Sequence, residues 1–105
     1  MDEIIVLAHA RARNGGEALL EKTMRAMVKP THAEEGCLKY AFHQSTEDKQ
    51  TFVMIEKWSS KEALDRHLKT PHIQELFKKL PALIQKPMQV QVYKSFPDGS
   101  PEKRL

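Results

Sequence analysis

Residues 52–73 carry the sequence FVMIEKWSSKEALDRHLKTPHI, and this stretch decides how the rest of the chain is interpreted. Its first part alternates as a β-strand does, because successive side chains of a strand point to opposite faces. One face therefore receives an apolar set that includes a single carboxylate: Phe52, Met54, Glu56 and Trp58. Ser59 then offers a hydroxyl that can cap a helix, with Glu62 three residues later as in a capping box. The stretch predicts a strand that leads directly into a helix.

The predicted helix after Ser59 carries a histidine on its apolar side. Four residues recur at helical spacing and define that side: Ala63, Leu64, His67 and Leu68. His67 is therefore expected to point toward the sheet that carries Trp58. Thr70 and Pro71 end this helix and begin the next, with Thr70 as its cap and Pro71 in the first helical position.

The remaining elements follow from the same periodicities. The sequence predicts a strand at 4–13, a helix at 17–29 that ends at Pro30, a loop at 31–36, strands at 37–44 and 50–58 that form a hairpin, the helical pair, a last helical turn between Pro81 and Pro87, and a strand at 88–96. The domain is expected to span residues 1–96, followed by a polar C-terminal tail at 97–105. The order βαββαβ predicts a ferredoxin-like α+β fold, with a four-stranded antiparallel or mixed sheet and its helices on one face. The helical crossover predicts that the first two strands run parallel.

Large apolar side chains occur on both faces of the first three predicted strands. A sheet face that carries such residues needs a cover, and the helices can cover only one of the two faces. A second copy of the same sheet is the simplest cover for the other face. The sequence therefore predicts a homodimer.

Composition limits the classes of function. The 105 residues form one domain, and the net charge of +3 is spread along the chain rather than gathered in a basic patch. The third strand also lacks the aromatic signature of RNA-binding sheets, so no nucleic-acid partner is expected. Cys37 is the sole cysteine, which excludes an internal disulfide. With no long apolar segment and an acidic start unlike a signal peptide, we expect a cytoplasmic protein without membrane contact.

The candidate functional groups are histidines, a carboxylate and aromatic residues. His67 has two interpretations that the residues leave open: a general base whose pKa is lowered by apolar surroundings, or a structural histidine held by a backbone carbonyl or by Glu56. Glu56 needs a partner on its apolar face, and Trp58 could form an aromatic wall or simply belong to the core. Further candidates for substrate contact are His72, His9, Tyr40 and Tyr93. No two histidines have the i, i+4 helix spacing that zinc sites favour, so no metal is expected.

Three segments resemble the antibiotic biosynthesis monooxygenase (ABM) superfamily: EEGCLKY at 34–40, FVMIEKW at 52–58 and SSKEALDRHLKTPHI at 59–73. The resemblance extends from the first strand to about Phe96. It implies a homodimer whose sheets pack into a dimeric α/β barrel, and a monooxygenase without flavin, haem or metal. In such enzymes a base deprotonates a small aromatic quinol or phenol, and the substrate itself supplies the electrons to dioxygen in a dry pocket. The resemblance favours His67 as that base, with Glu56 as the second predicted catalytic residue.

The same scaffold hosts several chemistries, so the resemblance alone does not fix the reaction. Polyketide-oxidising members resemble this chain at Trp58 but have polar side chains near the positions of Met54 and Leu64. Haem-degrading relatives need an axial histidine where the best match here is Phe77. Quinol-oxidising members are the most similar. Two further functions stay open on this scaffold: an isomerase-type enzyme for a small carbonyl metabolite, and a non-catalytic stress protein that binds small molecules.

Overall fold

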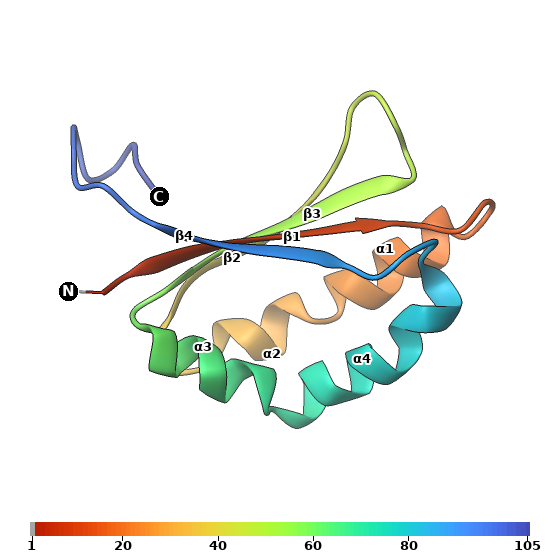
Figure 1. Cartoon of the computed structure of the whole chain (residues 1–105), viewed down its shortest axis with the longest axis horizontal. Coiled ribbons are helices and arrows are strands. Elements are labelled where there is room, and N and C mark those ends of the chain that lie inside the picture. Colours follow the sequence, from red (N-terminus) through yellow and green to blue (C-terminus); the bar gives the residue numbers. More distant parts are fainter. Residues whose placement is uncertain (1) are drawn as a thin grey trace.

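The computed structural model describes residues 2–105, which form four strands and four helices (Figure 1). In chain order these are β1 (Ile4–Arg11), α1 (Glu17–Arg25), α2 (Val28–His32), β2 (Cys37–Gln44), β3 (Thr51–Trp58), α3 (Lys61–Leu68), α4 (Pro71–Leu83) and β4 (Gln89–Lys94). The predicted ferredoxin-like α+β pattern is confirmed, with each of its two helical crossovers divided into two helices.

The four strands form one sheet in the order β2-β3-β1-β4, and every neighbouring pair is antiparallel. β1 and β2 therefore run in the same direction, as the helical crossover requires, but β3 lies between them. In this register Glu56 of β3 is flanked by Val6 of β1 and Tyr40 of β2. The central position of β3 thus places its carboxylate in the middle of the sheet.

All four helices cover the same face of the sheet, and the core lies between the two layers (Figure 1). The alternation predicted for residues 52–58 is confirmed, because the side chains of this strand that face the helices are all buried. The largest fully buried side chains of the helical layer come from α1 and α4. The buried set includes Val6, Ala8, Phe52, Met54 and Trp58 from the sheet, and Leu20, Met24, Ile73, Leu76 and Leu80 from the helices.

Two prolines do not end helices as the sequence predicts. Pro30 is the third residue of α2, in its first turn, where a backbone N–H has no helical partner and the lack of one costs little. The helix therefore continues to His32, and the loop predicted at 31–36 begins two residues later than expected. The predicted single helix at 17–29 is instead interrupted between Arg25 and Val28. Pro81 lies inside α4, exposed and only two residues before the helix ends. Its carbonyl accepts a hydrogen bond from the Arg13 guanidinium at 2.9 Å.

The start of α3 also differs from the prediction. Ser60, not Ser59, is the N-cap, and its hydroxyl accepts a hydrogen bond from the backbone N–H of Ala63 at 3.1 Å. Glu62 is then one position too early to complete a capping box. The predicted cap of the following helix is confirmed at Thr70, with Pro71 as its first residue. The predicted strands at 4–13, 50–58 and 88–96 are each shorter at one or both ends.

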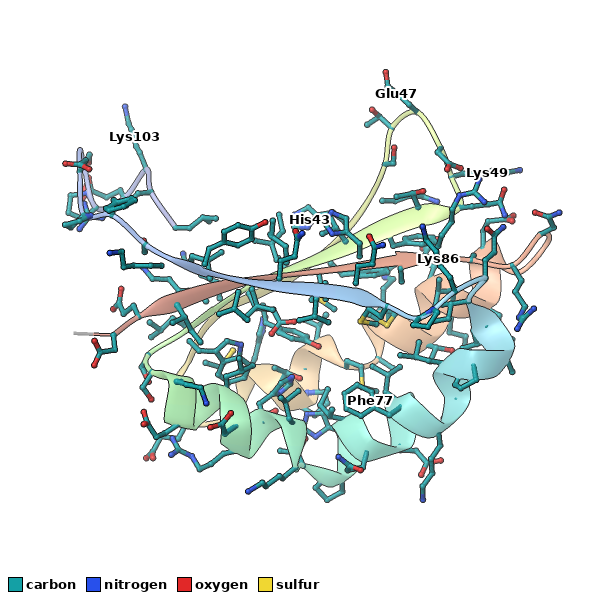
Figure 2. All side chains as sticks on the ribbon, in the orientation of Figure 1. His43, Glu47, Lys49, Phe77, Lys86 and Lys103 are labelled. Atoms are coloured by element: carbon teal, nitrogen blue, oxygen red, sulfur yellow. The ribbon has the colours of Figure 1, made fainter. Side chains whose placement is uncertain are left out.

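The face of the sheet opposite the helices is open in the single chain (Figure 1). Its centre is apolar and only partly covered, with Leu7, Val53 and Ile55 half-buried. Figure 2 shows His43 on this open face. No helix in residues 2–105 has the length and hydropathy needed to cross a bilayer.

Candidate active site

A small apolar cavity lies between the sheet and helices α3 and α4. Its volume is about 160 Å³. Three polar side chains reach its lining, Tyr40, Glu56 and His67, and the remaining lining residues are aliphatic, methionine or phenylalanine. A larger hollow of about 390 Å³ at the start of β1 is bordered by charged surface residues and contains no histidine. The small cavity is therefore the candidate active site, because it combines an apolar interior with a few converging polar groups.

His67 is held in this cavity by a carboxylate from outside α3. Its Nδ1 lies 2.8 Å from Oε2 of Glu34, which follows α2 in the connection to β2. Because a carboxylate can only accept hydrogen bonds, Nδ1 must carry the proton, and this assigns the neutral tautomer with Nε2 unprotonated. His67 is 3% exposed, and burial holds its pKa below the ordinary value, although Glu34 opposes that shift. The imidazole is thus neutral and basic at Nε2 near neutral pH.

Glu34 binds a second histidine through the same oxygen. Nε2 of His72, in the first turn of α4, lies 2.9 Å from Oε2 of Glu34 and 3.2 Å from the hydroxyl of Thr31. The His72 side chain is 21% exposed, so it occupies the outer side of this cluster, while His67 occupies the inner side. Glu34 therefore links α3 to α4 and fixes the orientation of both rings.

Glu56 is the second ionisable group of the cavity. The indole N–H of Trp58 donates to its Oε1 at 2.9 Å, and both residues are buried. Burial raises the pKa of Glu56 to about 7, and the nearby Glu34 charge contributes to the increase, while the bond from Trp58 opposes it. A carboxyl of this kind retains its proton close to neutral pH and can then donate a hydrogen bond as well as accept one.

Aromatic rings enclose His67 on its buried side. The Trp58 ring lies 4.5 Å from the imidazole between centroids, and the Tyr40 ring lies 5.5 Å away in an edge-to-face arrangement. Burial raises the pKa of the Tyr40 phenol, so that the hydroxyl stays protonated at neutral pH. These contacts restrict the rotamer of His67 and keep water from its buried side.

The structure brings together five of the seven site residues predicted from sequence. His67, Glu56 and Tyr40 line the cavity, Trp58 lies behind His67, and His72 joins them through Glu34. The remaining two lie elsewhere. His9 alternates along β1 with the cavity residue Ala8, and Tyr93 alternates along β4 with the cavity residue Val92. Both therefore lie on the open face rather than in the cavity. Tyr93 is exposed, and its hydroxyl donates to Gln91 at 2.7 Å.

Glu34 is the residue of the candidate site that sequence reasoning misses. The structural interpretation of His67 names Glu56 or a backbone carbonyl as its partner, but the partner is Glu34, 33 positions away in the chain. A long-range pair of this kind has no periodic signal. The one feature of the sequence that could have indicated the position of Glu34 is Gly36. Its φ of +88° turns the chain into β2 and places Glu34 beside α3.

Glu34, His67 and His72 also form a set of potential metal ligands. One ligand atom from each lies within 4.8 Å of the other two. Two imidazoles and a carboxylate suit several transition metals, including iron and zinc. Here the two ring nitrogens both approach one carboxylate oxygen. His67 donates a hydrogen bond to that oxygen, and His72 also contacts the hydroxyls of Thr31 and Thr70. The expectation that no metal binds stays a prediction.

The fold and this site define a small α+β protein with a histidine–carboxylate pair in an apolar cavity. The chain belongs to the antibiotic biosynthesis monooxygenase family, whose model matches residues 3–79. It is 30% identical over 97 residues to "Putative monooxygenase Rv0793" of Mycobacterium tuberculosis, covering 92% of this chain and 95% of that protein.

Solved structures agree with this assignment. The structure of Rv0793 superposes with a TM-score of 0.88 at 28% identity and covers 94% of this chain and 100% of that one. PA3566 of Pseudomonas aeruginosa superposes with a TM-score of 0.82 at 33% identity, covering 94% and 97% of the two chains. The chain also matches uncharacterized protein sll1783 of Synechocystis, at 28% identity over 93 residues, but spans 63% of the length of that protein.

Proposed function

We propose that the protein is a cofactor-independent monooxygenase that oxidises a small aromatic quinol or phenol with dioxygen. Family membership supports the reaction type, and the cavity supports the kind of substrate. The single observation that carries the proposal is the pairing of His67 with Glu34 at the wall of an apolar cavity. This arrangement provides a neutral base that is oriented by a carboxylate and shielded from water.

The reaction begins with deprotonation of the substrate. Nε2 of His67 takes the proton of a hydroxyl group, and the negative charge of Glu34 stabilises the resulting imidazolium. The substrate anion can then transfer electrons to dioxygen, which gives the balanced reaction hydroquinone + O₂ → hydroxyquinone + H₂O. Exclusion of water from the cavity favours charge interactions and protects reactive oxygen intermediates from side reactions.

Glu56 is suited to the opposite task. With a pKa of about 7, it is protonated in much of the enzyme at neutral pH. It lines the cavity from the sheet, on the side that faces α3. Its O–H can donate to an oxygen of the substrate or of reduced dioxygen while Trp58 holds its other oxygen. Burial raises the pKa of the Glu56 carboxyl and lowers that of the His67 imidazole, which suits the first to donate a proton and the second to accept one near neutral pH.

Oxygen consumption with a panel of hydroquinones tests the proposal. We expect His67→Ala to lower kcat/KM by at least about a hundredfold, the usual contribution of a general base. Arg66→Ala is the matched control, because Arg66 is the adjacent residue of α3 but is exposed, so its substitution should leave the rate unchanged. Equal rates for wild type and His67→Ala would exclude the proposed base. Peroxide should not accumulate, since its release would indicate an oxidase.

The same assay without oxygen separates a monooxygenase from an isomerase. An isomerase uses a base but no dioxygen, so turnover of a small carbonyl compound under anaerobic conditions that depends on His67 would support that class instead. Binding without turnover of any compound, unaffected by substitution at His67, would indicate a non-catalytic protein.

We also propose that the active form is a homodimer in which two open sheet faces pack together. The half-buried Leu7, Val53 and Ile55 at the centre of that face support this arrangement, because a single chain leaves them partly in water. The cavity lies on the helical side of the sheet, so pairing through the open face leaves the approach to His67 free.

A further inference from the structure

The cavity that contains His67 adjoins a second hollow along the gap between α4 and β4. This hollow has a volume of about 470 Å³. It shares three lining residues with the cavity: Phe77, Met88 and Val90. Figure 2 shows Phe77 projecting from α4 and Lys86 farther along the chain, where α4 leads into β4. The two spaces are therefore neighbours across a shared apolar wall, which we call the junction.

The cavity alone is too small for a large substrate. Its volume of about 160 Å³ is close to the roughly 150 Å³ of an engineered apolar cavity that holds one benzene ring. A substrate whose hydroxyl reaches His67 can place a single ring there. A longer part has to extend out of the cavity, and the junction offers an apolar path, because the Phe77 and Val90 side chains there are 44% and 56% exposed.

The second hollow has a definite chemical character. Along its length it is lined by Leu80, Ile84 and further apolar residues. Its charged lining residues are both cationic, Arg13 and Lys86, and no carboxylate lines it. An aliphatic chain fits the apolar walls, and an anionic end fits the two cations.

We propose that the site binds a single-ring phenol or hydroquinone carrying an aliphatic tail that ends in a carboxylate. The ring occupies the cavity beside His67, the tail passes Phe77 and Val90, and the carboxylate reaches Arg13 or Lys86. This inference rests on the proposed function for the role of the ring hydroxyl, and it adds the identity of the substituent.

Binding can be measured without turnover. The probes are 4-alkylphenols with one to eight carbons in the chain, and matched ω-(4-hydroxyphenyl)alkanoic acids, titrated calorimetrically under nitrogen. We expect Kd to fall by up to about fourfold for each added methylene until the hollow is filled, because a buried methylene contributes about 0.8 kcal/mol. The acids of sufficient length should bind at least about fivefold more tightly than alkylphenols of equal length. A Kd that does not depend on chain length would overturn the proposal.

Variants locate the tail. Lys86→Glu should abolish the preference for the carboxylate-ended probes. Lys78→Glu reverses the charge of an exposed lysine that lies on α4 and does not line the hollow, so it should preserve the preference. Val90→Gln should weaken the dependence on chain length by making the junction polar. Leu19→Gln is its control, because Leu19 is equally exposed, at 57%, but lies on α1. Identical behaviour of Lys86→Glu and Lys78→Glu would remove the cationic end from the proposal.

The two proposals fail in different ways. If binding depends on the tail but tailed hydroquinones cause no oxygen consumption, the monooxygenase function is refuted and the proposed binding of the tail stands. If the enzyme oxidises hydroquinones with and without a tail at the same rate, the monooxygenase function stands and the proposed tail on the substrate is refuted.

Discussion

Glu34 accepts a hydrogen bond from His67 and contacts His72 through the same oxygen, so its charge should govern the behaviour of His67. In Glu34→Gln the imidazolium loses its counter-charge, and kcat should fall on the order of a hundredfold. The same charge raises the pKa of His67 against the effect of burial, so its removal should shift the acidic limb of the pH–rate profile to lower pH. NMR titration of His67 checks the shift directly.

Glu35→Gln provides the control for this substitution. Glu35 is the adjacent residue and is exposed, so neutralising it removes an equal charge without touching the cluster. A purely structural role for Glu34 would lower the melting temperature and leave the acidic limb of the remaining activity in place. That result would contradict the positioning role.

Glu56 should make stability depend on pH in an unusual direction. Its pKa rises from an ordinary 4.5 to about 7, so between these values the folded chain keeps a proton that the unfolded chain has lost. The free energy of unfolding therefore falls as pH rises through this window, by on the order of 3 kcal/mol in total. Glu56→Gln is uncharged throughout and should lack this component.

Urea denaturation at pH 5 and pH 8 measures the effect as a difference between the two proteins. We expect Glu56→Gln to gain stability relative to wild type on going from pH 5 to pH 8. His67 contributes a slope of opposite sign, because its lowered pKa removes stability as pH falls below about 6.5, but this contribution is common to both proteins. Equal slopes would mean that Glu56 ionises as an ordinary carboxyl.

At the scale of elements, the turn before β2 determines where Glu34 lies. Gly36 has a φ of +88°, and a Cβ at this position would lie 2.5 Å from Cβ of Ala63 in α3. Gly36→Ala should therefore cost about 3 kcal/mol of folding free energy, through backbone strain and displacement of α3. Gly15→Ala is the control: it has a similar φ of +78°, but nothing lies within 4 Å of the added atom, so about 1 kcal/mol is expected. Chemical denaturation of both variants checks the difference.

Elements with strong periodicity can be predicted from the sequence, and helix ends cannot. The alternation of residues 52–58 and the apolar side of α3 identify the strand, the helix and the inward direction of His67 correctly. Pro30 and Pro81 mislead because a proline is tolerated in a first turn or near a helix end, where few backbone bonds are lost. His9 is a candidate that the cavity does not include, because the alternation of a strand does not by itself show which of its two faces borders the cavity.

At the scale of the whole molecule, the open sheet face predicts how the protein associates. Wild type should sediment with twice the mass of one chain. Ile55→Asp places a charge at the centre of the apolar open face and should shift the protein toward monomers, with little change in the circular dichroism of the helices. Lys79→Asp, on the exposed side of α4, is the control and should remain dimeric. A wild-type protein that sediments as a monomer at high concentration would refute the proposed dimer.

The family model ends at residue 79, whereas the mouth of the cavity is built partly from Met88, Val90 and Val92 at β4. The acid–base groups all come from residues 34–72, which precede that limit. Under the proposed mechanism the acid–base groups therefore lie within the matched residues, whereas one wall of the cavity, formed by Met88, Val90 and Val92, lies beyond them. We therefore predict that substitutions at Val90 and Val92 change which compounds enter the cavity and leave the proposed proton-transfer groups in place.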